Sequence, residues 1–261
     1  MCRHVAYIGP ELALQEILFL PPHGLARQAS DPEELRYARL NADGFGFGWY
    51  GEDDTAVVYR RGDPIWQDPN LVPLARNLYA DLWLAAVRSA TPGFGGDVVN
   101  AQPFANGDLL YSHNGLIDGF RPEIRREIQN LLDPDVEAEI LGSTDSEYLF
   151  ALIRQYLIDD ADLSLEGAMM EAFTTLEPWM GPGRALLNVI LTDGDRLVAS
   201  RHAINDACPS LYYTSDDDGF PEGAVVIASE PLTERERWRS VPEGHVLVVV
   251  PDEPPELLAL R

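Results

Sequence analysis

The order of strand-like and helix-like segments is the feature that most restricts the fold of this chain. Strand-like runs come first, three segments with helical spacing follow between residues 122 and 176, and strand-like runs return from residue 186 to residue 250. Regular alternation of strands and helices would indicate βαβ units, whereas this order suits antiparallel sheets with helices packed outside them. We therefore predict an α+β fold.

The apolar spacing also places the individual elements. Helices are expected at residues 122–132, 145–156 and 164–176, and the Pro-rich stretch 251–255 is expected to be a terminal segment. No repeat or linker interrupts the pattern, so residues 2–261 are expected to form a single domain, near the upper size limit for one core. Strands are expected at residues 1–9, 44–50, 56–59, 82–87, 109–112, 186–192, 196–201, 211–214, 224–229 and 245–250.

One expected hairpin has an unusual composition. Glycine alternates with aromatic residues from Gly44 to Tyr50, and a turn-forming stretch at residues 51–54 precedes the second strand. Alternating glycines remove the side chains from one face of a strand. We expect another backbone or a ligand to approach that face closely.

The chain is strongly acidic, with 43 Asp and Glu against 19 basic residues, all of them arginine, and a formal charge of −24. Such a field repels phosphate backbones and anionic lipid surfaces and attracts cationic small molecules. We therefore expect neither nucleic-acid nor membrane partners. Adaptation of the whole surface, to salt or to genome composition, explains the acidity as well, so charge alone does not select a function.

We expect a cytoplasmic protein. The early apolar run from Leu12 to Leu20 contains two polar residues and ends at two prolines, so it resembles neither a signal peptide nor a membrane span. Two cysteines, Cys2 and Cys208, cannot build a disulfide framework, which fits a reducing compartment. The histidines lack metal-ligand spacing, so neither a metal nor a cofactor is expected.

Cys2 has a property that an internal cysteine lacks, because removal of Met1 would leave a free α-amino group beside the thiol. That amine has an ordinary pKa of roughly 7.7 to 8.0, so it can accept the thiol proton near neutral pH and return it to a leaving amine. Nucleophile and base then share one residue, as in N-terminal threonine hydrolases. By itself a cysteine at this position is more often incidental.

Three further motifs could complete a site. After a buried strand, Asn114 and Gly115 can offer a side-chain amide and a backbone N–H to a developing oxyanion, although Asn-Gly is also a common tight turn. Arg88 ends another buried strand, and its planar guanidinium suits a carboxylate, although a strand-end arginine is often a surface charge. Asp145 starts a helix, where it could face a substrate ammonium group or simply cap the helix, a role open to Thr144 or Ser143 as well.

Together these residues match one ligand, a glutamyl amide, and the sequence here resembles the class II glutamine amidotransferases of the N-terminal-nucleophile superfamily. The motifs that carry the resemblance follow the family's order over most of the chain. They are the starting Met-Cys2-Arg-His, Asp43-Gly44-Phe45-Gly46-Phe47-Gly48-Trp49, Arg88-Ser89-Ala90-Thr91, Asn100-Ala101-Gln102-Pro103-Phe104, His113-Asn114-Gly115, Thr144-Asp145-Ser146-Glu147 and Ala228-Ser229-Glu230-Pro231-Leu232.

The resemblance implies a four-layer αββα sandwich, with two antiparallel sheets between helical layers. It implies Cys2 as nucleophile and an oxyanion hole formed by Asn114 and Gly115. It also implies that the glutamyl group is bound by three residues, which are Arg88, Thr91 and Asp145.

Two departures from the synthetase-linked members bear on the substrate. Thr91 is followed by Pro92 where those members usually continue Thr-His-Gly, and Gln102 replaces the histidine of Asn-Ala-His-Pro. The chain also has no length left for a synthase domain. Within the family it looks most like the stand-alone amidohydrolase of ergothioneine biosynthesis, which removes glutamate from γ-glutamyl-hercynylcysteine sulfoxide.

This small molecule is therefore the expected partner, and its trimethylammonium group would suit an acidic protein with exposed aromatic residues. A first alternative is a glutaminase subunit that passes ammonia from glutamine to a separate synthase partner. A second is a catalytically silent binding protein with the same fold, in which a retained Met1 would block the amine.

Overall fold

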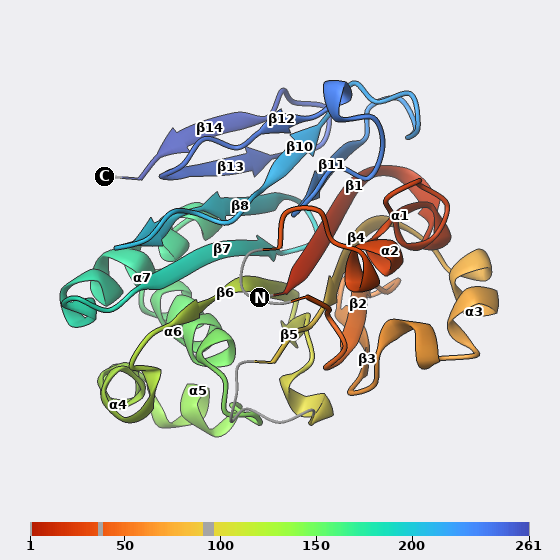
Figure 1. Ribbon diagram of the computed structural model, residues 1–261. Helices are drawn as coiled ribbons and strands as arrows, with labels where there is room; N and C mark the ends of the chain where they lie inside the picture. Colours follow the sequence, from red (N-terminus) through yellow and green to blue (C-terminus); the bar gives the residue numbers. More distant parts are fainter. Residues whose placement is uncertain (1, 36–38, 91–96, 261) are drawn as a thin grey trace.

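The computed structural model describes residues 2–35, 39–90 and 97–260, in which two sheets of antiparallel strands pack face to face (Figure 1). The first sheet has the order β12 (Arg239–Ser240), β10 (Tyr212–Thr214), β11 (Val225–Ala228), β1 (Arg3–Ala13), β4 (Tyr79–Val87), β2 (Phe45–Tyr50) and β3 (Ala56–Arg61). The second has the order β14 (Glu256–Ala259), β13 (His245–Val249), β8 (Leu197–Arg201), β7 (Ala185–Thr192), β6 (Leu109–Ile117) and β5 (Phe104–Asn106), with β9 (Ala203–Ile204) pairing to β7.

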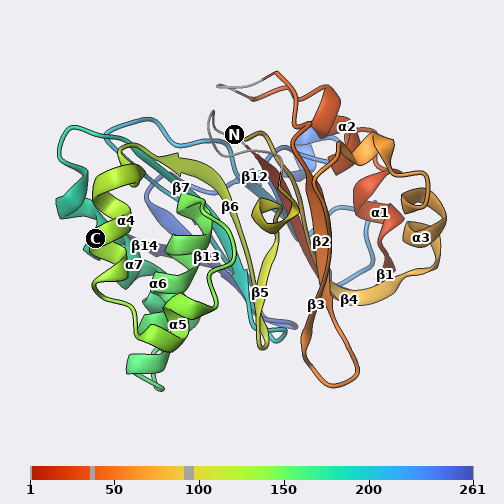
Figure 2. The ribbon, with the colours of Figure 1, turned by 90° about the horizontal axis from the view of Figure 1, so that it is seen from below.

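Helices cover the outer face of each sheet, as the view in Figure 2 shows. The first sheet carries α1 (Gln15–Leu18), α2 (Leu25–Ser30) and α3 (Leu71–Asn77). The second carries α4 (Arg125–Gln129), α5 (Pro134–Ala138), α6 (Asp145–Asp159) and α7 (Leu165–Met180). Single turns occur at η1 (Ile65–Gln67), η2 (Val98–Asn100), η3 (Phe120–Ile124) and η4 (Arg235–Arg237). The predicted α+β fold with four αββα layers is confirmed.

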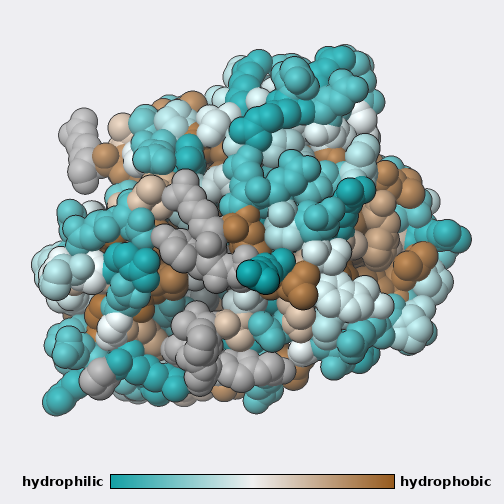
Figure 3. Space-filling model, viewed as in Figure 1, coloured by the Kyte–Doolittle hydropathy of each residue, from teal (hydrophilic) through white to brown (hydrophobic). Residues whose placement is uncertain are grey.

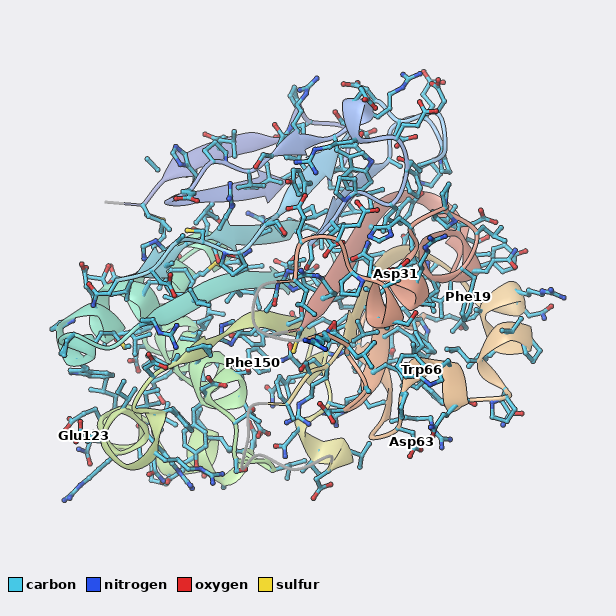
Figure 4. The ribbon with its side chains drawn as sticks, in the orientation of Figure 1. Phe19, Asp31, Asp63, Trp66, Glu123 and Phe150 are labelled. Carbon is cyan, nitrogen blue, oxygen red and sulfur yellow. The ribbon has the colours of Figure 1, made fainter. Side chains whose placement is uncertain are left out.

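Three apolar cores separate the four layers, and strand alternation assigns each side chain to one of them. In β1, Val5 and Tyr7 pack toward the helices, whereas Ala6 and Ile8 pack between the sheets. In β6, Leu110 likewise faces the space between the sheets, whereas Tyr111 faces the helices. Tyr111 stacks there on Phe150 of α6, labelled in Figure 4, with ring centroids 4.9 Å apart.

The glycine-aromatic strand is β2, and its bare face meets the second sheet. A Cβ on Gly46 would lie 2.6 Å from the carbonyl oxygen of Gln102, and a Cβ on Gly48 would lie 2.8 Å from a methyl carbon of Leu110. Phe45 and Phe47 fill the opposite, helix-covered face. The expected close approach of another backbone is therefore confirmed.

Some elements differ from the sequence-based assignment. The helix expected at residues 122–132 forms as η3 followed directly by α4, which ends at Gln129. Arg121, just before the expected start, precedes a proline and adopts an extended conformation (φ −104°, ψ 127°). The segment expected to be terminal, 251–255, is instead a connection, since the chain returns from it as β14 to pair with β13. The short helices α1, α2, α3 and α5 and the short strands β5, β9 and β12 were not predicted.

Hydrophilic residues cover much of the face seen in Figure 3, in agreement with the acidic composition. Within the described ranges, no helix has the length and apolar character needed to cross a bilayer.

Candidate active site

The start of the chain lies where β1 and β6 approach each other (Figures 1 and 2). Arg3 pairs with Val87 of β4, so continuation of the antiparallel register places Cys2 opposite Arg88. Alternation along β1 and β4 turns both residues toward the space between the sheets, and both are buried. Asn114 faces the same space from β6, because it shares its strand face with Leu110. Three sequence-predicted residues thus meet from two sheets.

Hydrogen bonds tie the two strands together across that space. Nδ1 of His4 lies 2.9 Å from Oγ of Ser112, and Nδ2 of Asn114 donates to Oγ of Ser229 over 3.4 Å. Oγ of Ser229 also accepts from the backbone N–H of His4, and the backbone N–H of Ser229 donates to the His4 carbonyl. Ser229 therefore fixes the distance between the strand that carries the thiol and the strand that carries the amide.

Asn114 and Gly115 are not a turn, because both lie within β6 and pair with Asn188 and Leu187 of β7. The expectation that the strand ends before them was wrong. Among the described residues, Oδ1 of Asn114 is buried without a hydrogen-bond partner, and its Nδ2 makes only the long bond to Ser229. A buried amide with spare capacity is what a substrate could complete.

Gly115 is required by its surroundings. A Cβ here would lie 1.8 Å from the carbonyl oxygen of Leu186 and 2.2 Å from Nε2 of His113. The His113 ring occupies that space, with Nε2 2.7 Å from the Leu186 oxygen and Nδ1 3.0 Å from Oγ of Ser146. A carbonyl can only accept, so Nε2 carries the proton and the serine hydroxyl donates to Nδ1.

Both buried histidines are neutral at pH 7. The pKa of His4 is lowered to about 3, mainly by burial and in smaller part by the nearby His113 and Arg3. Burial also lowers the pKa of His113, against the opposing charge of Asp145. Neither imidazole is therefore a cationic partner for the thiol.

The Asp43-Gly44 motif positions Arg88. The Arg88 backbone N–H donates to the Gly44 carbonyl, and its carbonyl accepts from the Asp43 N–H. Its guanidinium donates to the Asp43 carbonyl over 3.2 Å, and the Asp43 carboxylate accepts from the N–H of Ala90. Arg88 is thus a buried side chain on a backbone held in place by hydrogen bonds, and not a surface charge. Thr91, the next expected glutamyl contact, lies outside the described residues.

Asp145 is the first residue of α6, and Thr144 supplies the cap by accepting from the N–H of Glu147. The Asp145 carboxylate accepts from two backbone N–H groups, those of Ile117 at the end of β6 and of Ser146. A carboxylate has about four acceptor positions, so these bonds orient Asp145 without exhausting it. The alternative in which Asp145 serves only as the helix cap is wrong, because Thr144 supplies that cap.

The loop before α6 is held by two other motif residues. Oδ1 of Asn100 accepts from the Ser143 N–H over 3.1 Å. The Glu147 carboxylate accepts from the N–H groups of Leu141 and Gly142 at 2.9 and 2.7 Å. These contacts give Asn100 and Glu147 a structural role at the site that the sequence reasoning did not assign.

A buried ion pair next to Cys2 was also missed. Nε of Arg3 lies 2.7 Å from the Glu230 carboxylate, and the two side chains are 0% and 1% exposed. The same carboxylate accepts from the N–H groups of Glu33 and Glu34 and lies 2.8 Å from Nε2 of His23. Burial alone would raise the pKa of Glu230, but the His23 hydrogen bond and the Arg3 charge outweigh it and lower the pKa to about 2. The sequence signals were the two motifs that contain Arg3 and Glu230.

A cavity of about 350 Å³ adjoins this region. Its wall connects to β1 through Glu230, which pairs with Arg3 and binds the backbone of Glu33 and Glu34. It connects to β7 through Asn188, whose Nδ2 donates to the Ser210 carbonyl. Its lining consists of Glu33, Glu34, Leu35, Arg201, Ser210 and Tyr212.

The tryptophans offer little to a cationic ligand. Trp83 is fully buried and donates Nε1 to the Leu12 carbonyl, and Trp238 is buried and donates to Thr233. Trp66, labelled in Figure 4, is 50% exposed and lies in η1, which precedes α3. Within the described ranges, no group of His, Cys, Asp and Glu residues suits a metal ion.

Comparison with known proteins supports this picture. Residues 33–217 match the family model described as glutamine amidotransferases class-II. Over 95% of the chain, the sequence is 32% identical to a γ-glutamyl-hercynylcysteine sulfoxide hydrolase of Mycolicibacterium smegmatis, covering 96% of that protein. A protein of the same name from Mycobacterium tuberculosis is 30% identical over 95% of the chain and 93% of its own length. A Saccharomyces cerevisiae protein named as a probable glutamine amidotransferase is 30% identical, covering 95% of the chain and 82% of that protein.

Solved structures agree on the fold. A glutamine aminotransferase class-II domain protein from Silicibacter pomeroyi superposes with a TM-score of 0.72 at 24% identity, covering 99% of both chains. Glutamine phosphoribosylpyrophosphate amidotransferase from B. subtilis superposes with a TM-score of 0.66 at 16% identity, covering 99% of this chain and 49% of that one. The predicted enzyme class, hydrolysis of an amide carbon–nitrogen bond, is confirmed at the level of the family. On this evidence the chain belongs to the class II glutamine amidotransferases.

Proposed function

We propose that this protein hydrolyses the γ-glutamyl amide of γ-glutamyl-hercynylcysteine sulfoxide and releases glutamate and hercynylcysteine sulfoxide. The observation that carries the proposal is the meeting of Cys2 and Arg88 on one sheet with Asn114 on the other, all facing the same buried space. The substrate assignment is supported by the mycobacterial relatives of that name, which are similar over nearly their full length.

The proposed reaction begins after removal of Met1. The α-amine of Cys2 takes the thiol proton, and the thiolate sulfur bonds to the γ-carbonyl carbon. The electron pair of the carbonyl moves to its oxygen, where Nδ2 of Asn114 and the N–H of Gly115 donate to the oxyanion. The carbon–nitrogen bond then breaks, and the leaving amine receives the proton from the α-ammonium. Water attacks the remaining thioester in the same way and releases glutamate and the thiol.

The glutamyl group would be bound through the two opposite charges on its α-carbon. The Arg88 guanidinium, anchored by Asp43, suits the α-carboxylate. The Asp145 carboxylate, oriented by the N–H groups of Ile117 and Ser146, suits the α-ammonium group. Thr91, which follows Arg88 in the same motif, is proposed as a third contact to the glutamyl group. A substrate lacking either of these charged groups should therefore lose most of its affinity.

The cavity beside the site is proposed to receive the other half of the substrate. Its lining includes Glu33, Glu34 and Tyr212, with the Glu34 carboxylate already paired to Arg235. Carboxylates and aromatic faces attract a trimethylammonium group. Arg235 already stacks over Tyr212, 4.8 Å from the ring centroid, so one face of that ring is occupied.

Steady-state glutamate release tests the proposal. The purified protein, Cys2→Ala and Cys208→Ala are compared on γ-glutamyl-hercynylcysteine sulfoxide and on glutamine. Cys208 is the matched control, since it is the other cysteine and is also buried. We expect Cys2→Ala alone to abolish turnover, and we expect a strong preference for the first substrate. Full activity of Cys2→Ala would refute the assigned nucleophile.

A second candidate function, a glutaminase subunit, is favoured by the similarity to the yeast protein named as an amidotransferase. It would pass ammonia from glutamine to a separate synthase. Preference for glutamine in the same assay, together with stimulation by a co-purifying synthase, would select this function. Preference for the hercynylcysteine substrate would reject it.

A further inference from the structure

Gln102 comes just before β5 in the chain, beside a part of β6 that extends beyond the residues paired with β5. The pairing of β5 with β6 runs from Asn106 opposite Leu109 to Phe104 opposite Tyr111, so the same register would place Gln102 opposite His113. There its side-chain amide makes the hydrogen bonds to the β6 backbone that a paired strand would otherwise make. The His113 N–H donates to Oε1 over 2.6 Å, and Nε2 donates to the His113 carbonyl over 3.1 Å.

This pair of bonds fixes the peptide unit before Asn114. The His113 carbonyl and the Asn114 N–H belong to the same planar unit, so holding one orients the other. On the opposite edge of β6, Asn114 pairs with Asn188 of β7. The backbone of Asn114 is therefore held from both edges of its strand, by a strand on one side and by Gln102 on the other.

The Gln102 amide is itself anchored. The side chain is buried, and the Gln102 carbonyl packs against Gly46 of β2, where a Cβ would come within 2.6 Å. The preceding carbonyl, that of Ala101, accepts from the Arg60 guanidinium over 3.4 Å. The bare face of β2 thus allows a connection from the first sheet to the strand that carries Asn114.

Gln102 also defines where pairing on this edge of β6 stops. Antiparallel strands direct the N–H groups of successive residues to opposite edges, so His113 and Gly115 share one edge. The neighbouring residue of β7 agrees, because the Leu187 N–H points away from β6 and donates to the His202 carbonyl. Among the described strands, none pairs with Gly115 on the Gln102 side. Its N–H stays available for a ligand.

We propose that Gln102 is a positioning residue for the oxyanion-binding pair Asn114 and Gly115, acting through the His113 backbone. This inference rests on the proposed function of that pair. The position requires one acceptor and one donor at the end of a side chain of glutamine length. Glutamate keeps the acceptor but sets a second oxygen against the His113 carbonyl, and methionine keeps the length with neither bond.

The test compares wild type with Gln102→Glu and Gln102→Met. Gln129→Glu, the same chemical change on α4 in the outer layer, controls for the added charge. We expect both Gln102 variants to lower kcat by roughly 10-fold to 100-fold and to leave KM within about twofold. The upper end of that range is about the smallest effect seen when one oxyanion donor is removed outright. The alkylation rate of Cys2 by iodoacetamide should not change, because that reaction uses no oxyanion hole. Amide hydrogen exchange at His113 should accelerate.

The outcomes separate the two levels of the account. A kcat within about twofold of wild type in both variants would overturn the positioning role, and so would a loss confined to KM. A parallel loss of alkylation rate and melting temperature would mean that Gln102 only supports the fold, which also overturns it. If wild type hydrolyses no γ-glutamyl substrate, the proposed function fails, and faster His113 exchange with unchanged alkylation would still support the positioning role.

Discussion

Replacing Glu230 by glutamine should strongly destabilise the protein. The substitution keeps the shape of the side chain but leaves Arg3 as a buried charge without its ionic partner. Removing one member of a buried pair costs about 3–5 kcal/mol. The pKa of Glu230, lowered from an ordinary value of 4.5 to about 2, leads independently to about 3 kcal/mol in favour of the folded state.

The pH dependence follows from the sign of that shift. A carboxyl with a lowered pKa stabilises the fold fully above pH 4.5, and its contribution is lost as the pH falls toward 2. Wild type should therefore lose about 3 kcal/mol from this group across that interval, and Glu230→Gln should lack this component. At pH 7 the Glu230 carboxylate makes its full contribution to stability. The unfolding free energies of wild type and Glu230→Gln are therefore compared at pH 7 first.

The assay is urea-induced unfolding followed by tryptophan fluorescence and circular dichroism. Glu243→Gln is the matched control, because Glu243 pairs with Arg201 but is 56% exposed. Exposed pairs contribute about 0–1 kcal/mol, so the control should remain close to wild type. A loss below about 1 kcal/mol in Glu230→Gln, equal to that of the control, would refute the reasoning about the buried pair.

Three other predictions follow from the site. Gly115→Ala should abolish turnover and lower the melting temperature, because its Cβ would lie 1.8 Å from the Leu186 oxygen; an active, equally stable variant would contradict the placement of this strand. Stability should decline as the pH falls from 6.5 toward 3, because the unfolded chain binds a proton that buried His4, with a pKa of about 3, cannot; urea titrations of His4→Asn should show a flatter decline, and an unchanged slope would argue against it. Dialysis against EDTA should leave glutamate release unchanged, and a loss reversed by added zinc would show that a metal has been overlooked.

Strand alternation made much of the site predictable from sequence. Once Leu82 and Leu84 are assigned to the space between the sheets, Arg88 follows on the same face of the chain, and the same step along β6 carries Leu110 to Asn114. The motifs then supplied the expected roles. Sequence could not supply the bonds that join the two sheets, such as Asn114 to Ser229, because they depend on the distance between strands far apart in the chain.

The missed features have physical reasons. The helices α1, α2 and α3 have only 4, 6 and 7 residues, too few turns for a periodic signal to emerge. The strand β14 follows a Pro-rich connection that reads as a chain end, and only pairing with β13 defines it. Asn114-Gly115 carries a strong turn signal, which here is overridden by pairing with β7 and by the His113 ring above Gly115.

Trapping the acyl-enzyme tests the central claim most directly. Wild type and Cys2→Ala are mixed with γ-glutamyl-hercynylcysteine sulfoxide, quenched in acid within the first turnovers, and analysed by intact-protein and peptide mass spectrometry. We predict that wild type has lost Met1 and carries a γ-glutamyl group on Cys2, and that Cys2→Ala carries none. A wild-type protein that retains Met1, or that releases glutamate while the adduct lies on another residue, would contradict the account.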